Sequence, residues 1–261
     1  MINIKSFNLQ NLFHMKDNHL KQPAQRRGFL RDIGAGAAAL GLAALTSSFK
    51  FGNHQEKSDA VNILPGTKDP ADIWFDSVKG SHRIVYDSTQ PHEIFPFVWP
   101  RIFLVTNAAT GTPETDCGVV VVLRHESICY AFKDDVWKKY NMGDVFKAHE
   151  VGGAFQAADA KTATKTRNPF YMTKPGDFAA PGFGAVAIGI PELQASGVMF
   201  CVCNAAITVY SNVVAGMMGL KPDDVMKEWK AGLIPGVQVV PSGVWALGRA
   251  QEHGCKYIFA G

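Results

Sequence analysis

The sequence lacks the short motifs that mark most nucleotide-binding and hydrolytic enzymes. It has no phosphate-binding loop, no nucleophile elbow and no dinucleotide-binding fingerprint, because the glycines at positions 34–41 follow no predicted strand. No pair of Cys-x-x-Cys repeats is present, and His82, His92 and His149 do not have the spacing of metal ligands. We therefore assign the chain neither a metal nor a cofactor.

Charged residues are few, at 19% of the 261 residues, whereas hydrophobic residues make up 47%. This composition excludes a disordered chain or a coiled coil and supplies enough apolar material for a sizeable core. The formal net charge is +3, but residues 1–50 hold seven of the 26 basic and two of the 23 acidic residues. The other 19 basic and 21 acidic residues give the rest of the chain a charge of −2. This balance gives no reason to expect nucleic acid as a partner.

The basic start of the chain has the layout of an export signal. Residues 33–45 are uncharged and rich in Ala, Gly and Leu, but as a helix they would span only about 20 Å of a ~30 Å membrane core. They also have no polar face, unlike an ordinary amphipathic helix. A basic region before a short apolar one predicts a twin-arginine (Tat) signal over residues 1–48. Its motif residues are Arg26, Arg27, Phe29 and Leu30.

A Tat signal predicts a folded protein exported to the periplasm or elsewhere outside the cytoplasm, with the Tat export machinery as a partner. No Ala-x-Ala site ends the signal, so cleavage near residues 44–48 and retention as an uncleaved membrane anchor are both open. Met1 and Met15 are both candidate starts. Because the five cysteines are odd in number, at least one thiol is expected to be free or paired between chains.

Apolar runs and helical stretches alternate over residues 80–261, after a linker (a tether) and an entry segment at residues 49–79. Residues 117–123 and 197–203 are typical of strands buried on both faces. Three more strands are predicted over residues 82–87, 237–240 and 255–259. Helices are predicted over residues 95–109, 134–147 (an exposed helix), 191–196, 205–218, 223–231 and 243–253. This order predicts one α/β domain with a parallel sheet covered on both faces.

Residues 149–187 interrupt this alternation with a stretch rich in Gly, Ala, Thr, Lys and Pro. Loops of this length are uncommon in a compact domain unless they are functional or disordered. The composition favours a surface excursion or a contact between subunits, with a lid over a site as the alternative.

Cys203 is the first candidate for chemistry, because ligands of open parallel sheets bind beyond the carboxyl ends of the strands. It ends the strand at 197–203, where a helix is predicted to begin near Ala205 with Asn204 as its N-cap. Free amides and the positive helix end favour a thiolate, the form that attacks sulfur or carries sulfane sulfur. The alternative is a structural cysteine that packs as a small hydrophobe. That structural role is expected for Cys117, Cys201 and Cys255.

Two further side chains are predicted at the same edge of the sheet. His125 follows the strand at 117–123 and can act as an acid or base, or orient an anion, near neutral pH. A solvated loop histidine between Arg124 and Glu126 is the alternative. Asp87 ends the strand at 82–87 and is expected to line the same edge.

From His82 to its end, apart from the loop at residues 149–187, the sequence resembles the DsrE/DsrF-like sulfur-relay family. The likeness lies in residues 82–87, Asn107, residues 119–122 with His125, and residues 197–204, 235–243 and 251–258. The resemblance implies a three-layer α/β/α sandwich with a five-stranded, mainly parallel sheet, assembled as a homo-oligomer (a trimer or hexamer). It also implies that Cys203, just after the third strand, carries sulfur as a persulfide.

We therefore expect an exported protein that binds or transfers sulfane sulfur from a small sulfur compound on Cys203. In this prediction His125 takes part in the chemistry, and Asn204 and Asp87 line the binding site. The alternative is a non-catalytic module of the same fold, which binds a small ligand or assembles into an oligomer. The sequence leaves open whether the protein is an enzyme.

Overall fold

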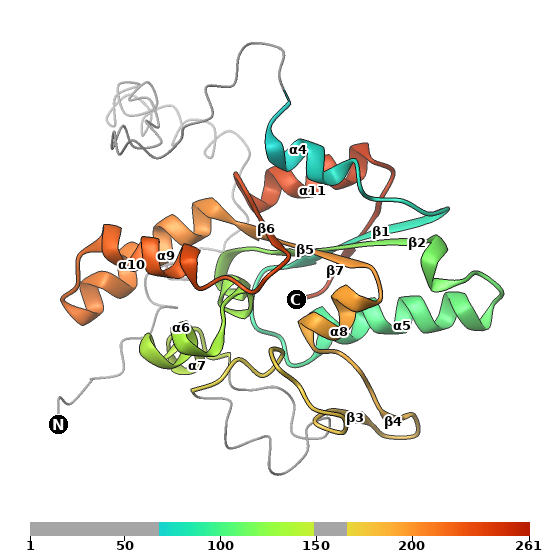
Figure 1. Cartoon of the computed structure of the whole chain (residues 1–261), viewed down its shortest axis with the longest axis horizontal. Coiled ribbons are helices and arrows are strands. Elements are labelled where there is room, and N and C mark those ends of the chain that lie inside the picture. Colours follow the sequence, from blue (N-terminus) through green and yellow to red (C-terminus); the bar gives the residue numbers. More distant parts are fainter. Residues whose placement is uncertain (1–67, 149–165) are drawn as a thin grey trace, which may run out of the picture. The chain divides into compact units, whose positions relative to one another are not determined.

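The structure is a computed structural model that describes residues 68–148 and 166–261 (Figure 1). The predicted export signal, with Arg26, Arg27, Phe29 and Leu30, lies outside the described residues, as do His149 and most of the predicted tether. Over the two described ranges, no helix has the length and apolar character needed to cross a membrane.

Five strands form the central sheet, in the order β6-β5-β2-β1-β7. They are β1 (His82–Ser88), β2 (Cys117–Leu123), β5 (Val198–Cys203), β6 (Val237–Val240) and β7 (Lys256–Phe259). Every neighbouring pair is parallel, so the predicted five-stranded parallel sheet is confirmed. The central strand β2 is buried at every position, as its unbroken apolar run predicts for a strand covered on both faces.

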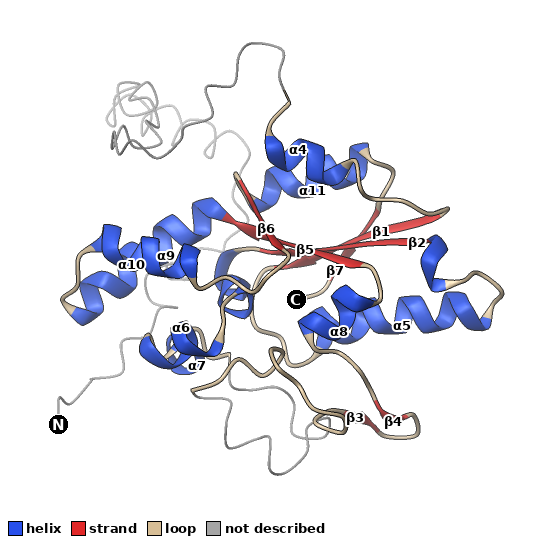
Figure 2. Ribbon diagram, viewed as in Figure 1, coloured by secondary structure: helices blue, strands red, loops and turns tan. Residues whose placement is uncertain are grey.

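Helices cover the two faces of this sheet, which confirms the three-layer α/β/α fold (Figure 2). On one face lie α4 (Pro70–Phe75) and α11 (Gly243–Glu252), where Phe75 and Leu247 share a buried cluster with Val120. On the other face lie α5 (Phe95–Ala109) and α8 (Ile190–Ala195). There the Phe97 ring stacks on Phe200 of β5, with 6.3 Å between ring centroids. Part of the segment expected to precede the fold is thus α4, which packs into the core.

The carboxyl end of β5 continues directly into α9 (Asn204–Met218), which packs against α10 (Pro222–Ala231) (Figure 1). Gly219 ends α9 with a φ of +67°, a left-handed conformation that glycine adopts without strain. Apart from the segment at 134–147, the predicted helices and strands agree with the structure to within one residue at each end.

The single exposed helix predicted over residues 134–147 is wrong. Two short helices, α6 (Asp134–Lys139) and α7 (Met142–Val145), occupy this segment. Asn141 separates them, because its φ of +51° is incompatible with a continuous right-handed helix. The segment is not an exposed face either, since the Trp137 and Met142 side chains are fully buried.

The described part of the predicted 149–187 loop is anchored to the core. Asn168 is fully buried, and its Nδ2 donates to the backbone oxygens of Tyr130 and Phe132, each at 2.8 Å. The Phe170 ring stacks on Phe97 of α5 with centroids 3.9 Å apart. Beyond these anchors, β3 (Ala179–Ala180) and β4 (Gly184–Ala185) form a short antiparallel ladder. This part of the loop therefore contributes buried side chains to the core as well as running over the surface.

Candidate functional site

The alternation of side chains along the strands brings three polar residues to one face of the sheet. Val85 of β1, Val122 of β2 and Cys201 of β5 all belong to the cluster beneath α4 and α11. Residues two positions further along a strand point to the same face. Asp87, Arg124 and Cys203 therefore lie on the α11 side, at the carboxyl edge of the sheet.

Arg124 and Asp87 form a bidentate ion pair at this edge. Nε of Arg124 lies 2.6 Å from Oδ1 of Asp87, and Nη2 lies 2.9 Å from Oδ2. The hydroxyl of Tyr257, from the edge strand β7, also donates to Oδ2 at 2.9 Å. The Asp87 side chain is only 2% exposed, whereas that of Arg124 is 27% exposed. The carboxylate is thus the buried end of the pair, and the guanidinium is the end that faces solvent.

Cys203 itself caps α9. Its backbone is extended (φ −71°, ψ 110°), and its Sγ accepts a hydrogen bond from the backbone N–H of Ala206 at 3.2 Å. The prediction that Asn204 is the N-cap is wrong by one residue, because Asn204 already lies in the first turn of the helix. Its Oδ1 is buried and has no hydrogen-bond partner among the described residues. Cys203 is 6% exposed.

Arg124 lies next to Cys203. Leu123 of β2 pairs with Val202 of β5, so the next residues along the two strands, Arg124 and Cys203, lie at the same level of the sheet edge. The hydrogen bond that Arg124 donates to Asp87 raises the pKa of Arg124 above its ordinary value, and Tyr257 and Cys203 add to the increase. The N-terminus of α11 begins at Gly243, beside the Arg124 side chain. The neighbours of the thiol that the structure gives are thus the amide at the start of α9 and the arginine that follows β2.

His125 is directed differently from Arg124. Its φ of +52° ends the regular alternation of β2, and the 3₁₀ helix His125–Ala131 begins there. Nε2 of His125 lies 3.2 Å from the hydroxyl of Tyr210 on α9, and the two rings meet edge to face. Burial raises the pKa of Tyr210, with further contributions from Glu126 and Cys129. The imidazole is exposed, so it can exchange protons with solvent.

The other four cysteines have the structural character expected of a small hydrophobe. None of the five cysteines, all of which lie in the described ranges, forms a disulfide. Burial raises the thiol pKa of each of the four, Cys117, Cys129, Cys201 and Cys255. Cys201 and Cys203 share a face two positions apart on one strand, a separation of about 6–7 Å that is too long for an unstrained disulfide.

Sequence reasoning assigned no role to Arg124, Tyr257 or Gly243. The signal for Arg124 was present: it follows the apolar run of β2 with the same spacing at which Asp87 follows Val85 and Cys203 follows Cys201. Tyr257 had no such signal, because its position next to Asp87 depends on the pairing of the first and last strands of the sheet.

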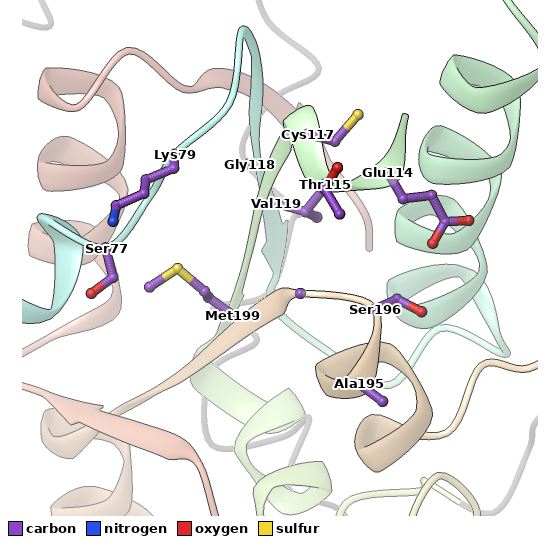
Figure 3. Close-up of a pocket in the computed structure, with 11 residues that line it drawn as sticks. Ser77, Lys79, Glu114, Thr115, Cys117, Gly118, Val119, Ala195, Ser196 and Met199 are labelled. Carbon is purple, nitrogen blue, oxygen red and sulfur yellow. The ribbon is translucent and has the colours of Figure 1, made fainter. Parts of the chain in front are cut away.

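A pocket lies at the opposite, amino-terminal edge of β2 and β5 (Figure 3). This cavity of about 470 Å³ is open to solvent and combines polar and apolar side chains. Lys79, Glu114, Cys117, Ser196 and Met199 are among the residues that line it. It contains none of the predicted site residues. In the described ranges, no group of three or more His, Cys, Asp or Glu side chains is arranged to hold a metal ion.

Comparison with known proteins gives little similarity. No family model matches the chain, and no curated protein matches it. Among solved structures, the chain is similar to MTH1491, a protein of unknown function from Methanobacterium thermoautotrophicum. The identity is 18% over 69% of this chain and 99% of that one, with a TM-score of 0.34. This similarity carries no functional information.

Proposed function

We propose that the protein carries sulfane sulfur as a persulfide on Cys203. The observation that supports this proposal best is the environment of the thiol: Sγ of Cys203 accepts a hydrogen bond from the Ala206 amide at the start of α9, and Arg124 follows the neighbouring strand β2 at the same level of the sheet edge. A persulfide anion at this position would receive the same amide and the same positive neighbour. In the other four cysteines, burial raises the thiol pKa, which favours the unreactive neutral thiol.

The transfer step needs no oxidant when the donor already contains sulfane sulfur. The Cys203 thiolate attacks the outer sulfur of a donor such as thiosulfate, and a new S–S bond forms. The donor's own S–S bond breaks, and sulfite leaves with the bonding electron pair. The thiol proton passes to solvent, and the part proposed for His125 is to exchange protons with solvent at the same edge of the sheet, where its ring lies against Tyr210. Since Cys201 is too far away to form a disulfide, the persulfide waits for an external thiol acceptor.

The cellular setting of this chemistry is also part of the proposal. The Tat signal predicted over residues 1–48 supports export to the periplasm, where the donor would be a small sulfur compound and not a cytoplasmic relay partner. Exposed side chains on the edge strand β7, among them Ile258 and Phe259, support assembly into a homo-oligomer such as a trimer or hexamer.

A non-catalytic binding or assembly module is the second candidate. The low exposure of Cys203, at 6%, favours it, because a carrier thiol must be reached by both donor and acceptor. Under this alternative, the Arg124–Asp87 pair and α11 would hold a small ligand at the sheet edge without forming a bond to it.

Persulfide trapping separates the two functions. Native protein is incubated with thiosulfate or polysulfide, alkylated, digested and analysed by mass spectrometry. We expect a gain of about 32 Da, one sulfur atom, on the Cys203 peptide. Cys203→Ser should abolish the gain, whereas the matched control Cys117→Ser, at the opposite sheet edge, should retain it. No gain, together with a Cys203 thiol that resists alkylation until the protein unfolds, would exclude the carrier function.

A further inference from the structure

The guanidinium of Arg124 has more N–H donors than its ion pair with Asp87 uses. Arginine carries five N–H groups, and Asp87 accepts two of them. No described residue accepts the other three. Because the side chain is 27% exposed while Asp87 is buried, the unused donors belong to the part of the guanidinium that solvent and ligands can reach. Such a fork binds carboxylate, sulfonate and other oxyanions with directional, charge-assisted hydrogen bonds.

We infer that Arg124, held in place by Asp87 and Tyr257, makes Cys203 selective for anionic reagents and thus for oxyanionic sulfur donors. The inference deepens the proposed function and, for its substrate class, rests on it. Thiosulfate is the simplest donor of this class: its sulfonate end would lie on Arg124 while its outer sulfur meets the Cys203 thiolate. As sulfite leaves with the electron pair of the broken S–S bond, its growing negative charge falls beside the guanidinium.

Asp87 and Tyr257 act as positioning residues in this arrangement. The bidentate contact fixes the plane of the guanidinium, and the Tyr257 hydroxyl fixes the carboxylate in turn at 2.9 Å. Asp87 also offsets part of the positive charge. The exposed end of the pair is nevertheless the cation, and the positive N-terminal end of α11 begins beside it at Gly243.

Two alkylating reagents of nearly the same shape test the inference without any sulfur donor. Iodoacetate is an anion and iodoacetamide is neutral, and both form a thioether with the thiolate as iodide leaves. We would measure the rate at which each reagent alkylates Cys203 by mass spectrometry. The ratio of the iodoacetate rate to the iodoacetamide rate is then divided by the same ratio for free glutathione. In the wild type the anionic reagent should be favoured. Arg124→Gln should lower the iodoacetate rate about 10- to 100-fold, with less than about threefold change for iodoacetamide.

Matched variants guard against a purely structural effect. Arg249→Gln removes another arginine of an ion pair, 2.7 Å from Asp72 and away from Cys203, and should leave the ratio unchanged. Arg124→Lys should recover part of the preference, and Tyr257→Phe should lower it only about threefold. If Arg124→Gln does not fold because Asp87 is left unpaired, the double variant Asp87→Asn with Arg124→Gln replaces the ion pair by two amides.

The outcomes distinguish the inference from the proposed function. An Arg124-dependent preference for iodoacetate without any persulfide from thiosulfate would retain the anion site and reject the carrier function. A persulfide on Cys203 with the same reagent ratio in wild type and Arg124→Gln would retain the carrier function and reject the anion site. Equal loss with both reagents, or a Cys203 that reacts with neither, would overturn the selective role of Arg124.

Discussion

A β-carbon on Gly243 would lie 2.4 Å from Cβ of Arg124. Helix α11 can therefore start beside Arg124 only because residue 243 has no side chain. The contact involves the first carbon of the Arg124 side chain, which cannot move without the backbone. A change in the rotamer of the guanidinium end would therefore not remove the clash. Gly243 thus links the position of α11 to the position of the ion pair with Asp87.

Gly243→Ala is expected to destabilise the protein by about 1–3 kcal/mol, the usual range for overpacking in a filled site. It should also lower persulfide trapping, because Arg124 must shift. Urea unfolding measures the first effect. Gly248→Ala is the matched control on the same helix: an added β-carbon there meets nothing within 4 Å. Higher helix propensity should make that variant about 0.5–1 kcal/mol more stable, and a loss at both positions would contradict the steric explanation.

Asn168→Ala should cost about 2–4 kcal/mol of unfolding free energy. The substitution removes two donors and leaves the buried backbone oxygens of Tyr130 and Phe132 without them. Asn212→Ala is the control: Asn212 is exposed, its amide bonds only within its own helix, and its loss should change stability by less than about 0.5 kcal/mol. Chemical denaturation followed by tryptophan fluorescence would measure both, and equal effects would show that Asn168 is not an anchor.

Phe170→Ala should destabilise the fold by about 3–5 kcal/mol, because the ring is fully buried against Phe97 and Phe178. Phe183 lies in the same loop but is 88% exposed. Its replacement by Ala should leave the melting temperature nearly unchanged. If Phe170→Ala were equally well tolerated, the described part of the loop would have to be held by contacts other than this stack.

The buried thiol of Cys255 should make the stability of the fold depend on pH in the alkaline range. Burial raises its pKa from 9.0 to about 11, with Arg83 acting in the opposite direction. The folded protein therefore holds this proton more tightly than the unfolded chain. The stabilisation is fully present below pH 9 and is lost as the pH rises through about 11. Cys255→Ala lacks this contribution, so the melting temperature of the wild type should fall more steeply between pH 9 and 11 than that of the variant. Parallel curves would contradict the assignment.

The sequence was sufficient to predict the sheet but only part of the site. Strands such as β2 could be predicted because an unbroken apolar run has one stable place, the middle of a covered parallel sheet. The Arg124–Asp87 pair could have been predicted from the spacing of both residues along their strands. The donation from Tyr257 could not, because it depends on a pairing between residues 170 positions apart.

Local backbone geometry accounts for the remaining differences. The positive φ of Asn141 divides one predicted helix into two, and that of His125 places its ring against Tyr210. Neither residue type requires such a conformation, so tertiary packing decides it. The N-cap of α9 differed from the prediction by a single residue. Asparagine is among the usual N-cap residues and cysteine is not, so the sequence favoured Asn204 over Cys203.

The pairing of β7 with β1 also has a consequence for how the molecule is made. β1 leaves the ribosome long before residues 256–259 are synthesised, yet these two strands lie side by side in the finished sheet. Until then the Asp87 carboxylate lacks the hydrogen bond from the Tyr257 hydroxyl. Such distant pairings form late and slowly. The set of hydrogen bonds around the Asp87 carboxylate is therefore completed only after the last strand of the sheet has been translated.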